Sequence, residues 1–81
     1  MMAVVAHSDR WTRQMLTDAL TAQGCEVTEA SNGGTALRLI KQALPAFVVL
    51  EQRLSELSGS EVAAAVRSDP LLRGTGVFVL R

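Results

Sequence analysis

The sequence has little of several residue types that commonly build a functional site. Cys25 is its only cysteine, so the chain can form no internal disulfide and no cysteine-based metal cluster. His7 is its only histidine, which excludes a histidine pair or a Cys/His set of zinc ligands. No glycine-rich phosphate loop follows the first apolar run, and no nucleophile-elbow motif is present. These absences remove most enzyme classes, and we do not expect an enzyme.

Net charge and long apolar runs are missing as well. Eight basic and eight acidic residues cancel, so no net field draws the chain to nucleic acid or to an anionic membrane. The longest apolar run, residues 43–50, is interrupted by Pro45 and is too short to cross a bilayer. Residues 1–6 lack the basic flank and the apolar length of a secretory signal. We therefore expect a cytoplasmic protein that binds neither nucleic acid directly nor a membrane.

What the sequence does contain is the composition of one small globular domain. The 81 residues are 48% hydrophobic and 20% charged, which excludes a disordered tail. A chain of this length buries only about 60% of the surface that its unfolded form exposes, so its stability margin is thin. We expect a single domain over residues 1–81.

Apolar runs and helical stripes alternate along this domain. Continuous or alternating apolar segments predict strands at residues 2–6, 25–30, 46–50 and 77–80. Apolar residues at helical spacing predict helices at residues 10–23, 35–43 and 60–67. Ser8 or Asp9 is the expected N-cap of the first helix, and Asn32-Gly33-Gly34 is expected to be a plain turn. The alternation predicts a parallel α/β sheet with right-handed crossovers.

In an open parallel sheet the functional site lies beyond the carboxyl ends of the strands. His7 and Ser8 follow the first predicted strand, Glu51 follows the third and Arg81 follows the fourth. His7 and Glu51 are expected to be neighbours if the first and third strands are adjacent. We also expect Glu51 and Arg81 to form an ion pair across adjacent strands.

The same segments, taken in order, resemble the receiver domain of bacterial two-component response regulators. The resemblance covers the whole chain, and no single piece of it is very specific. It depends on the order and spacing of residues 4–5, 24–27, 29–33, 36–37, 47–59, 67–70 and 77–80.

The resemblance implies a flavodoxin-like, doubly wound parallel sheet with strand order 2-1-3-4. A full receiver continues with a helix, a fifth strand and a last helix, so we expect residues 1–81 to be an incomplete receiver with four strands and three helices. The family transfers a phosphoryl group from a histidine kinase to an aspartate at the end of the third strand. An acidic pair after the first strand helps to bind Mg²⁺, and a hydroxyl residue ends the fourth strand.

At these positions the sequence departs from the family. His7 and Ser8 replace the acidic pair, Glu51 replaces the phosphoryl-accepting aspartate, and Arg81 stands at the hydroxyl position. Imidazole and hydroxyl groups are poor Mg²⁺ ligands, so we expect neither a metal nor another cofactor. The resemblance therefore implies a pseudo-receiver that acts through a protein partner, which would be a histidine kinase, an output domain or another receiver.

Several alternatives stay open from the sequence alone. Glu51 could still be phosphorylated, could imitate the phosphorylated state, or could be a solvated loop residue. The chain could also be a small ligand-binding α/β domain. Arg10 and Arg13 are expected on a solvated helix face. The strand at residues 77–80 would lie at an exposed sheet edge, through which the chain could associate with itself.

Overall fold

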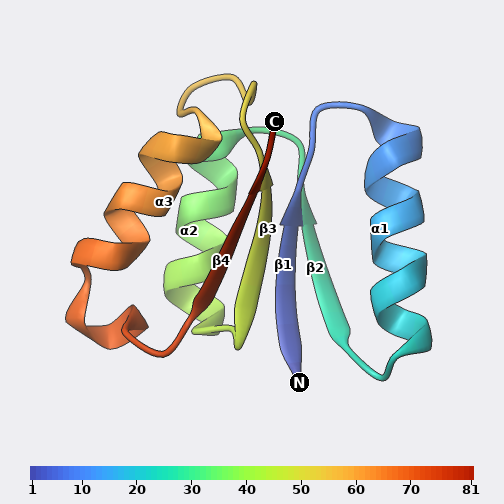
Figure 1. The fold of residues 1–81 in the computed structure, drawn as a ribbon, viewed down its shortest axis with the longest axis horizontal. Helices are drawn as coiled ribbons and strands as arrows, with labels where there is room; N and C mark the ends of the chain where they lie inside the picture. Colours follow the sequence, from blue (N-terminus) through green and yellow to red (C-terminus); the bar gives the residue numbers. More distant parts are fainter.

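A computed structural model describes residues 1–81 and shows strands and helices in strict alternation (Figure 1). The strands are β1 (Met2–Ala6), β2 (Glu26–Ala30), β3 (Phe47–Glu51) and β4 (Gly76–Leu80). The helices are α1 (Arg10–Ala22), α2 (Gly33–Ala43) and α3 (Gly59–Ser68), followed by a short 3-10 turn (Pro70–Leu72). The alternation predicted from the sequence is confirmed. No helix is both long and apolar enough to cross a membrane.

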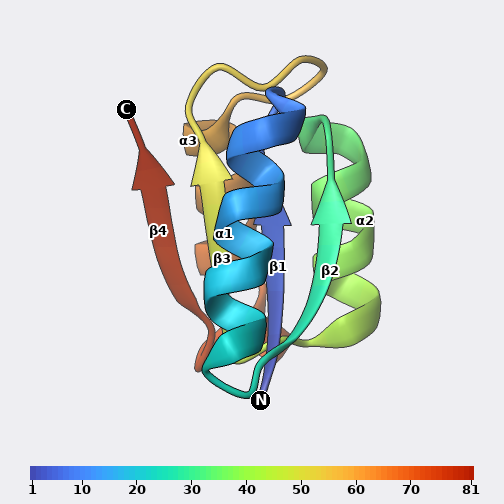
Figure 2. The same cartoon turned by 90° about the vertical axis from the view of Figure 1, so that its right-hand side faces the viewer.

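The four strands form one parallel sheet in the order β2-β1-β3-β4 (Figure 2). This is the predicted flavodoxin-like order. The helices lie on both faces of the sheet, with α2 and α3 on one face and α1 on the other (Figure 1). Because β1 and β3 are central, the loops that follow them meet at one rim of the sheet.

The main core lies between the sheet and the α2–α3 layer. Strand β1 is buried on both of its faces, as its continuous apolar run predicts. The buried set contains no polar or charged side chain. The largest fully buried residues are Ile40, Leu50, Leu72, Val4, Val5, Val48, Val62 and Val66.

Each long helix follows a strand in the chain and begins after a capping side chain. Asp9 caps α1, since its carboxylate accepts a hydrogen bond from the Thr12 N–H at 2.9 Å. Asn32 caps α2, and Ser58 with Glu61 forms a capping box at α3. These caps place the amino ends of all three helices at the rim where the strands end.

The predicted turn at residues 32–34 needs correction. Gly33 and Gly34 form the first turn of α2 rather than a free turn. The Gly33 N–H donates to the Ser55 carbonyl at 2.9 Å, and a Cβ placed on Gly33 would overlap the Leu57 carbonyl oxygen. The glycine is therefore needed because the β3–α3 loop passes directly over the start of α2.

Candidate functional site

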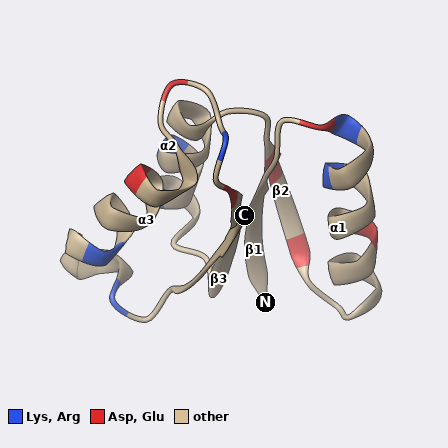
Figure 3. Cartoon of the chain, turned by 45° about the horizontal axis from the view of Figure 1, so that its top comes forward, with Lys and Arg blue, Asp and Glu red and all other residues tan.

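The candidate site lies at the rim formed by the carboxyl ends of the strands. Glu51 is the last residue of β3, while His7 and Ser8 follow the neighbouring β1 and Arg81 follows β4. Figure 3 is tilted to bring this rim forward and shows acidic and basic residues interspersed over it. The strand order thus brings together the residues that the sequence placed here.

The carboxylate of Glu51 is held by the loop that follows β1. Its Oε1 accepts a hydrogen bond from the Ser8 N–H at 2.7 Å and another from the Ser8 hydroxyl at 2.6 Å. The Nδ1 atom of His7 lies 3.6 Å from the same oxygen. The Glu51 side chain is only 20% exposed, so these contacts fix its position. The expected proximity of His7 and Glu51 is confirmed.

Two opposing effects set the pKa of Glu51. Burial of the carboxylate raises the pKa, but the hydrogen bonds from the Ser8 hydroxyl and the Ser8 N–H outweigh burial and bring the pKa below the ordinary glutamate value. His7 lowers the pKa further whenever its imidazole is charged, while Asp9 raises it slightly. Glu51 is therefore an anion at neutral pH.

This lowered pKa gives a pH prediction for Ser8→Ala. Loss of the hydroxyl removes one hydrogen bond to the charged carboxylate, so the pKa of Glu51 should rise. In the wild type, the stabilisation from ionised Glu51 is present above the ordinary glutamate pKa and is lost as the pH falls through the lower folded-state value. The side-chain carboxyl NMR signal of Glu51, followed against pH, measures the change. Ser60→Ala is the matched control because its hydroxyl bonds to Gln52 instead; equal Glu51 titrations in both variants would contradict the prediction.

His7 orders the loop as well as contacting Glu51. Its Nδ1 accepts a hydrogen bond from the Asp9 N–H at 3.0 Å, which places the ring proton of the neutral imidazole on Nε2. The His7 carbonyl accepts a bond from the Arg13 guanidinium at 2.8 Å. Arg13 also pairs with Glu29 on β2 at 3.0 Å. The prediction that Arg13 lies on a solvated face is therefore wrong, because the guanidinium fastens α1 to the site loop and to β2.

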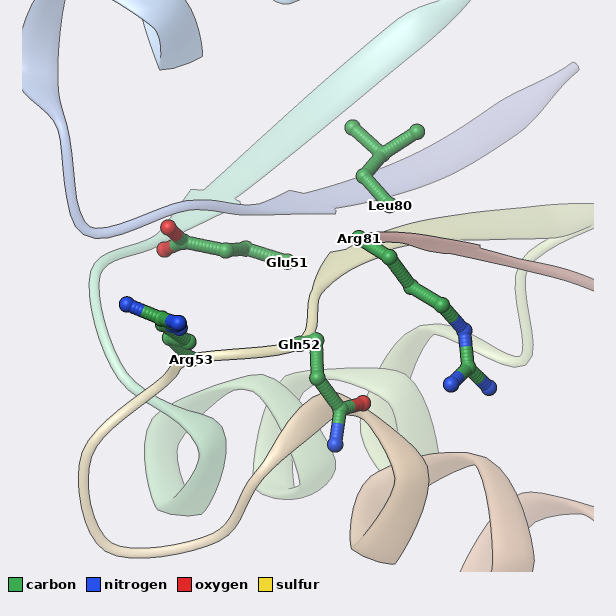
Figure 4. Close-up of a pocket in the computed structure, with 5 residues that line it drawn as sticks. All are labelled: Glu51, Gln52, Arg53, Leu80 and Arg81. Atoms are coloured by element: carbon green, nitrogen blue, oxygen red, sulfur yellow. The ribbon is translucent and has the colours of Figure 1, made fainter.

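The predicted ion pair between Glu51 and Arg81 is also wrong. The Glu51 carboxylate turns toward Ser8, and the Arg81 side chain extends away from it (Figure 4). The two residues nevertheless share the rim. They line an open pocket of about 300 Å³ together with Gln52, Arg53 and Leu80.

Gln52 and Gly59 support the site in ways that the sequence pattern did not reveal. The Gln52 side-chain oxygen accepts bonds from the Ser60 N–H at 3.0 Å and from the Ser60 hydroxyl at 2.6 Å. A Cβ on Gly59 would lie 2.5 Å from the Glu51 carbonyl oxygen. The start of α3 therefore packs directly against the backbone of the site. The only sequence signal for this contact is that Gly59 directly precedes the predicted start of the third helix.

The donor atoms around Glu51 differ from a typical magnesium site. Magnesium in proteins prefers hard oxygen ligands in octahedral geometry, with carboxylates as the usual protein donors. Here Glu51 is the single carboxylate beside an imidazole and a hydroxyl, and Asp9 is engaged as a helix cap. No group of three or more His, Cys, Asp or Glu side chains is placed to share a metal ion. These residues do not fit Mg²⁺.

Comparison with known proteins identifies the family. The signal receiver domain of the response regulator NarL from Mycobacterium tuberculosis superposes with a TM-score of 0.88 at 38% identity, over 96% of this chain and 63% of that one. In sequence, 58 residues are 43% identical to the probable transcriptional regulatory protein NarL of that organism, covering 69% of this chain and 27% of the relative. The chemotaxis response regulator CheY4 of Vibrio cholerae matches with a TM-score of 0.90 at 23% identity, which concerns the fold alone. No family model matches the chain.

The chain belongs to the receiver domains of two-component response regulators. It has the four parallel strands in the order 2-1-3-4 and is shorter than the receiver structures that it matches. The chain spans 27% of the length of the NarL relative and 51% of an uncharacterized 14.6 kDa protein from Leptolyngbya boryana, to which it is 34% identical.

Proposed function

We propose that this receiver domain signals through protein contacts and does not accept a phosphoryl group. The observation that carries the proposal is the state of Glu51, which stands at the end of β3 with its Oε1 bound by both donors of Ser8. Phosphoryl transfer depends on close positioning of the nucleophile and on a metal that neutralises developing charge. A longer side chain already held by Ser8, beside an imidazole and a hydroxyl, supports neither requirement.

The proposal includes the absence of a magnesium cofactor and of enzymatic activity. His7 and Ser8 occupy the places at which the family resemblance implies an acidic pair. The single remaining carboxylate cannot supply the oxygen-rich ligand set that Mg²⁺ favours. The domain would then bind a histidine kinase, an output domain or another receiver without a phosphorylation cycle.

Phosphorylation of the intact chain tests this function. The purified protein is incubated with acetyl phosphate and Mg²⁺, and its intact mass is measured beside a receiver known to accept phosphate. We expect no phosphoryl adduct on this chain, because the residues beside Glu51 do not fit Mg²⁺ and its Oε1 already accepts both hydrogen bonds of Ser8. An adduct that maps to Glu51 or His7 would overturn the proposal and establish a receiver phosphorylated at a non-standard residue.

A fixed negative charge is the role that the geometry supports for Glu51. The lowered pKa keeps the carboxylate ionised at neutral pH, and the Ser8 bonds hold it in one place. A partner that binds the rim would then contact a permanent negative charge, rather than one that phosphorylation adds and removes. Glu51→Gln keeps the side-chain shape and removes this charge, so weaker partner binding by Glu51→Gln is the expected signature.

A ligand-binding domain is the second candidate, and the pocket beside Glu51 favours it. Its volume of about 300 Å³ lies at the lower end of the range for small-molecule sites. Arg53 and Arg81 both line it, and neither forms an ion pair within the chain. Specific binding of a small anion that is lost in Arg53→Ala would favour this function over the first.

A further inference from the structure

One peptide group of the site loop connects a cation to the Glu51 carboxylate. This is the peptide between His7 and Ser8, which is planar and trans, so its carbonyl and its N–H point in opposite directions. The His7 carbonyl accepts a hydrogen bond from Nη1 of Arg13 at 2.8 Å. The Ser8 N–H donates to Oε1 of Glu51 at 2.7 Å. A guanidinium and a carboxylate are therefore bonded to the two ends of the same peptide group.

This peptide lies where the backbone hydrogen bonds between β1 and β2 end. The His7 N–H donates to the Ala30 carbonyl at 3.1 Å, and Ala30 is the last residue of β2. In an extended strand the carbonyl of a residue points to the same side as its N–H, so the His7 carbonyl also faces the β2 side, while the next N–H faces β3. Arg13 supplies the donor on the first side, and Glu51 supplies the acceptor on the second. Two side chains thus replace the backbone partners that the ladder no longer provides.

We propose that Arg13 positions the Glu51 carboxylate through the peptide group between His7 and Ser8. A hydrogen bond from a cation polarises the carbonyl, and the N–H at the other end of the peptide becomes a stronger donor because linked hydrogen bonds reinforce one another. The same bond fixes the peptide plane and hence the direction of the Ser8 N–H. Arg13 acts only through this peptide, since its own two bonds go to His7 and Glu29.

The Arg13 guanidinium is itself held in place. Its Nε donates to the Glu29 carboxylate on β2 at 3.0 Å, and its side chain is only 18% exposed. Because the guanidinium is rigid and planar, the bond from Nε to Glu29 also fixes the direction in which Nη1 donates to His7. We call Glu29, Arg13, the peptide between His7 and Ser8, and Glu51 the Arg13 relay.

The outer end of the Arg13 relay reaches the surface of the molecule. Glu29 is 34% exposed and lies on β2, which pairs with β1 alone and forms one edge of the sheet (Figure 2). A cationic group of a partner that binds Glu29 competes with Arg13 for this carboxylate and loosens the guanidinium. The relay therefore couples the β2 edge to the charge at the rim. This inference rests on the proposed function, because the fixed charge of Glu51 is what the relay would regulate.

NMR titration of the Glu51 side-chain carboxyl in the 81-residue chain tests the proposal. The Ser8 N–H bond is one of the contacts that lower the pKa of Glu51. In Arg13→Met this bond should weaken, so the pKa of Glu51 should rise and the Ser8 amide proton should move upfield. His7 and Asp9, the charged groups that face Glu51, are unchanged in this variant. A merely structural role of Arg13 would lower the melting temperature without moving either signal.

Arg10→Met is the matched control. It removes the same charge from the same helix, and the Arg10 side chain is exposed and forms no ion pair. Glu51 should titrate in this variant as in the wild type. Glu29→Gln should raise the pKa of Glu51 by less than Arg13→Met does. An unchanged Glu51 titration in Arg13→Met overturns the proposal. An equal rise in both arginine variants also overturns it, because the effect would then come from net charge.

Arg13→Lys decides the question if Arg13→Met does not fold. Lysine keeps the charge but lacks the planar group that bonds to both acceptors, so the pKa of Glu51 should still rise, by a smaller amount. An unchanged Glu51 titration in Arg13→Lys would then overturn the proposal. The phosphorylation experiment tests the proposed function separately. A phosphoryl adduct would overturn that function without altering these titrations of the unmodified chain.

Discussion

Gly33→Ala is expected to destabilise the domain even though alanine is the better helix former. In an open helix position the exchange would gain about 0.5–1 kcal/mol. At Gly33 the new Cβ would overlap the Leu57 carbonyl oxygen and lie 2.7 Å from its carbonyl carbon. Overpacking of this kind costs about 1–3 kcal/mol, and the obstacle here is backbone, which cannot rotate away. The steric cost therefore exceeds the gain in helix propensity.

Such a loss is large for a domain of this size. At roughly 0.05–0.15 kcal/mol per residue, 81 residues have a total stability of about 4–12 kcal/mol. Each kcal/mol shifts the melting temperature of a domain this small by about 4–8 °C. The melting temperature of Gly33→Ala should therefore fall by several degrees or more in a thermal scan followed by circular dichroism.

Gly74→Ala provides the control for this comparison. Nothing lies within 4 Å of a Cβ placed on Gly74, and its backbone is outside the left-handed region. Its melting temperature should match the wild type, whereas Gly59→Ala should resemble Gly33→Ala because its Cβ would press on the Glu51 carbonyl. Equal melting temperatures for Gly33→Ala and Gly74→Ala would show that the β3–α3 loop gives way easily.

The constraint on Gly33 is a part of the fold that the sequence pattern did not predict. The runs at β1 and β3 were predictable because strands buried on both faces must be continuously apolar. The parallel direction of the strands was predictable because helices separate them along the chain. Gly33 looked like a turn residue because its local neighbours are Asn32 and Gly34. Its actual constraint is the backbone of a loop more than twenty positions away, which no local pattern contains.

The site was predictable in position but not in its pairings. Parallel strands end at the same rim, so Glu51, His7 and Arg81 had to lie near one another. Charge alone then favoured an ion pair between Glu51 and Arg81. The structure instead joins Glu51 to Ser8, because the N–H and hydroxyl of Ser8 both reach the carboxylate from the adjacent β1. Side-chain direction at a strand end depends on such competing donors, and the sequence does not reveal which donor prevails.

The combined substitution His7→Asp, Ser8→Asp and Glu51→Asp is expected to create a Mg²⁺ site. It would place three carboxylates at the ends of the adjacent strands β1 and β3, which supplies the oxygen donors that Mg²⁺ prefers. Without metal, the three like charges should repel one another, and the hydrogen bond from the Ser8 hydroxyl to position 51 is lost. The variant should therefore melt below the wild type in metal-free buffer.

Added Mg²⁺ should reverse this loss, because an ion that binds only the folded state stabilises it. At a Mg²⁺ concentration 100 times the dissociation constant the gain is about 2.7 kcal/mol. At about 4–8 °C per kcal/mol, the melting temperature of the triple variant should rise by roughly 10–20 °C. Trp11 fluorescence should change saturably in the same titration, since Trp11 lies in the first turn of α1 beside the altered loop.

The wild type and Glu51→Asp alone should show neither response, because each has a single carboxylate among the three positions. Sodium chloride at matched ionic strength separates metal binding from simple screening of the added charges. If sodium chloride raises the melting temperature of the triple variant as much as Mg²⁺ does, the three carboxylates do not bind one common ion. Loss of the acidic pair would then not be enough to explain the poor fit of the wild-type residues to Mg²⁺.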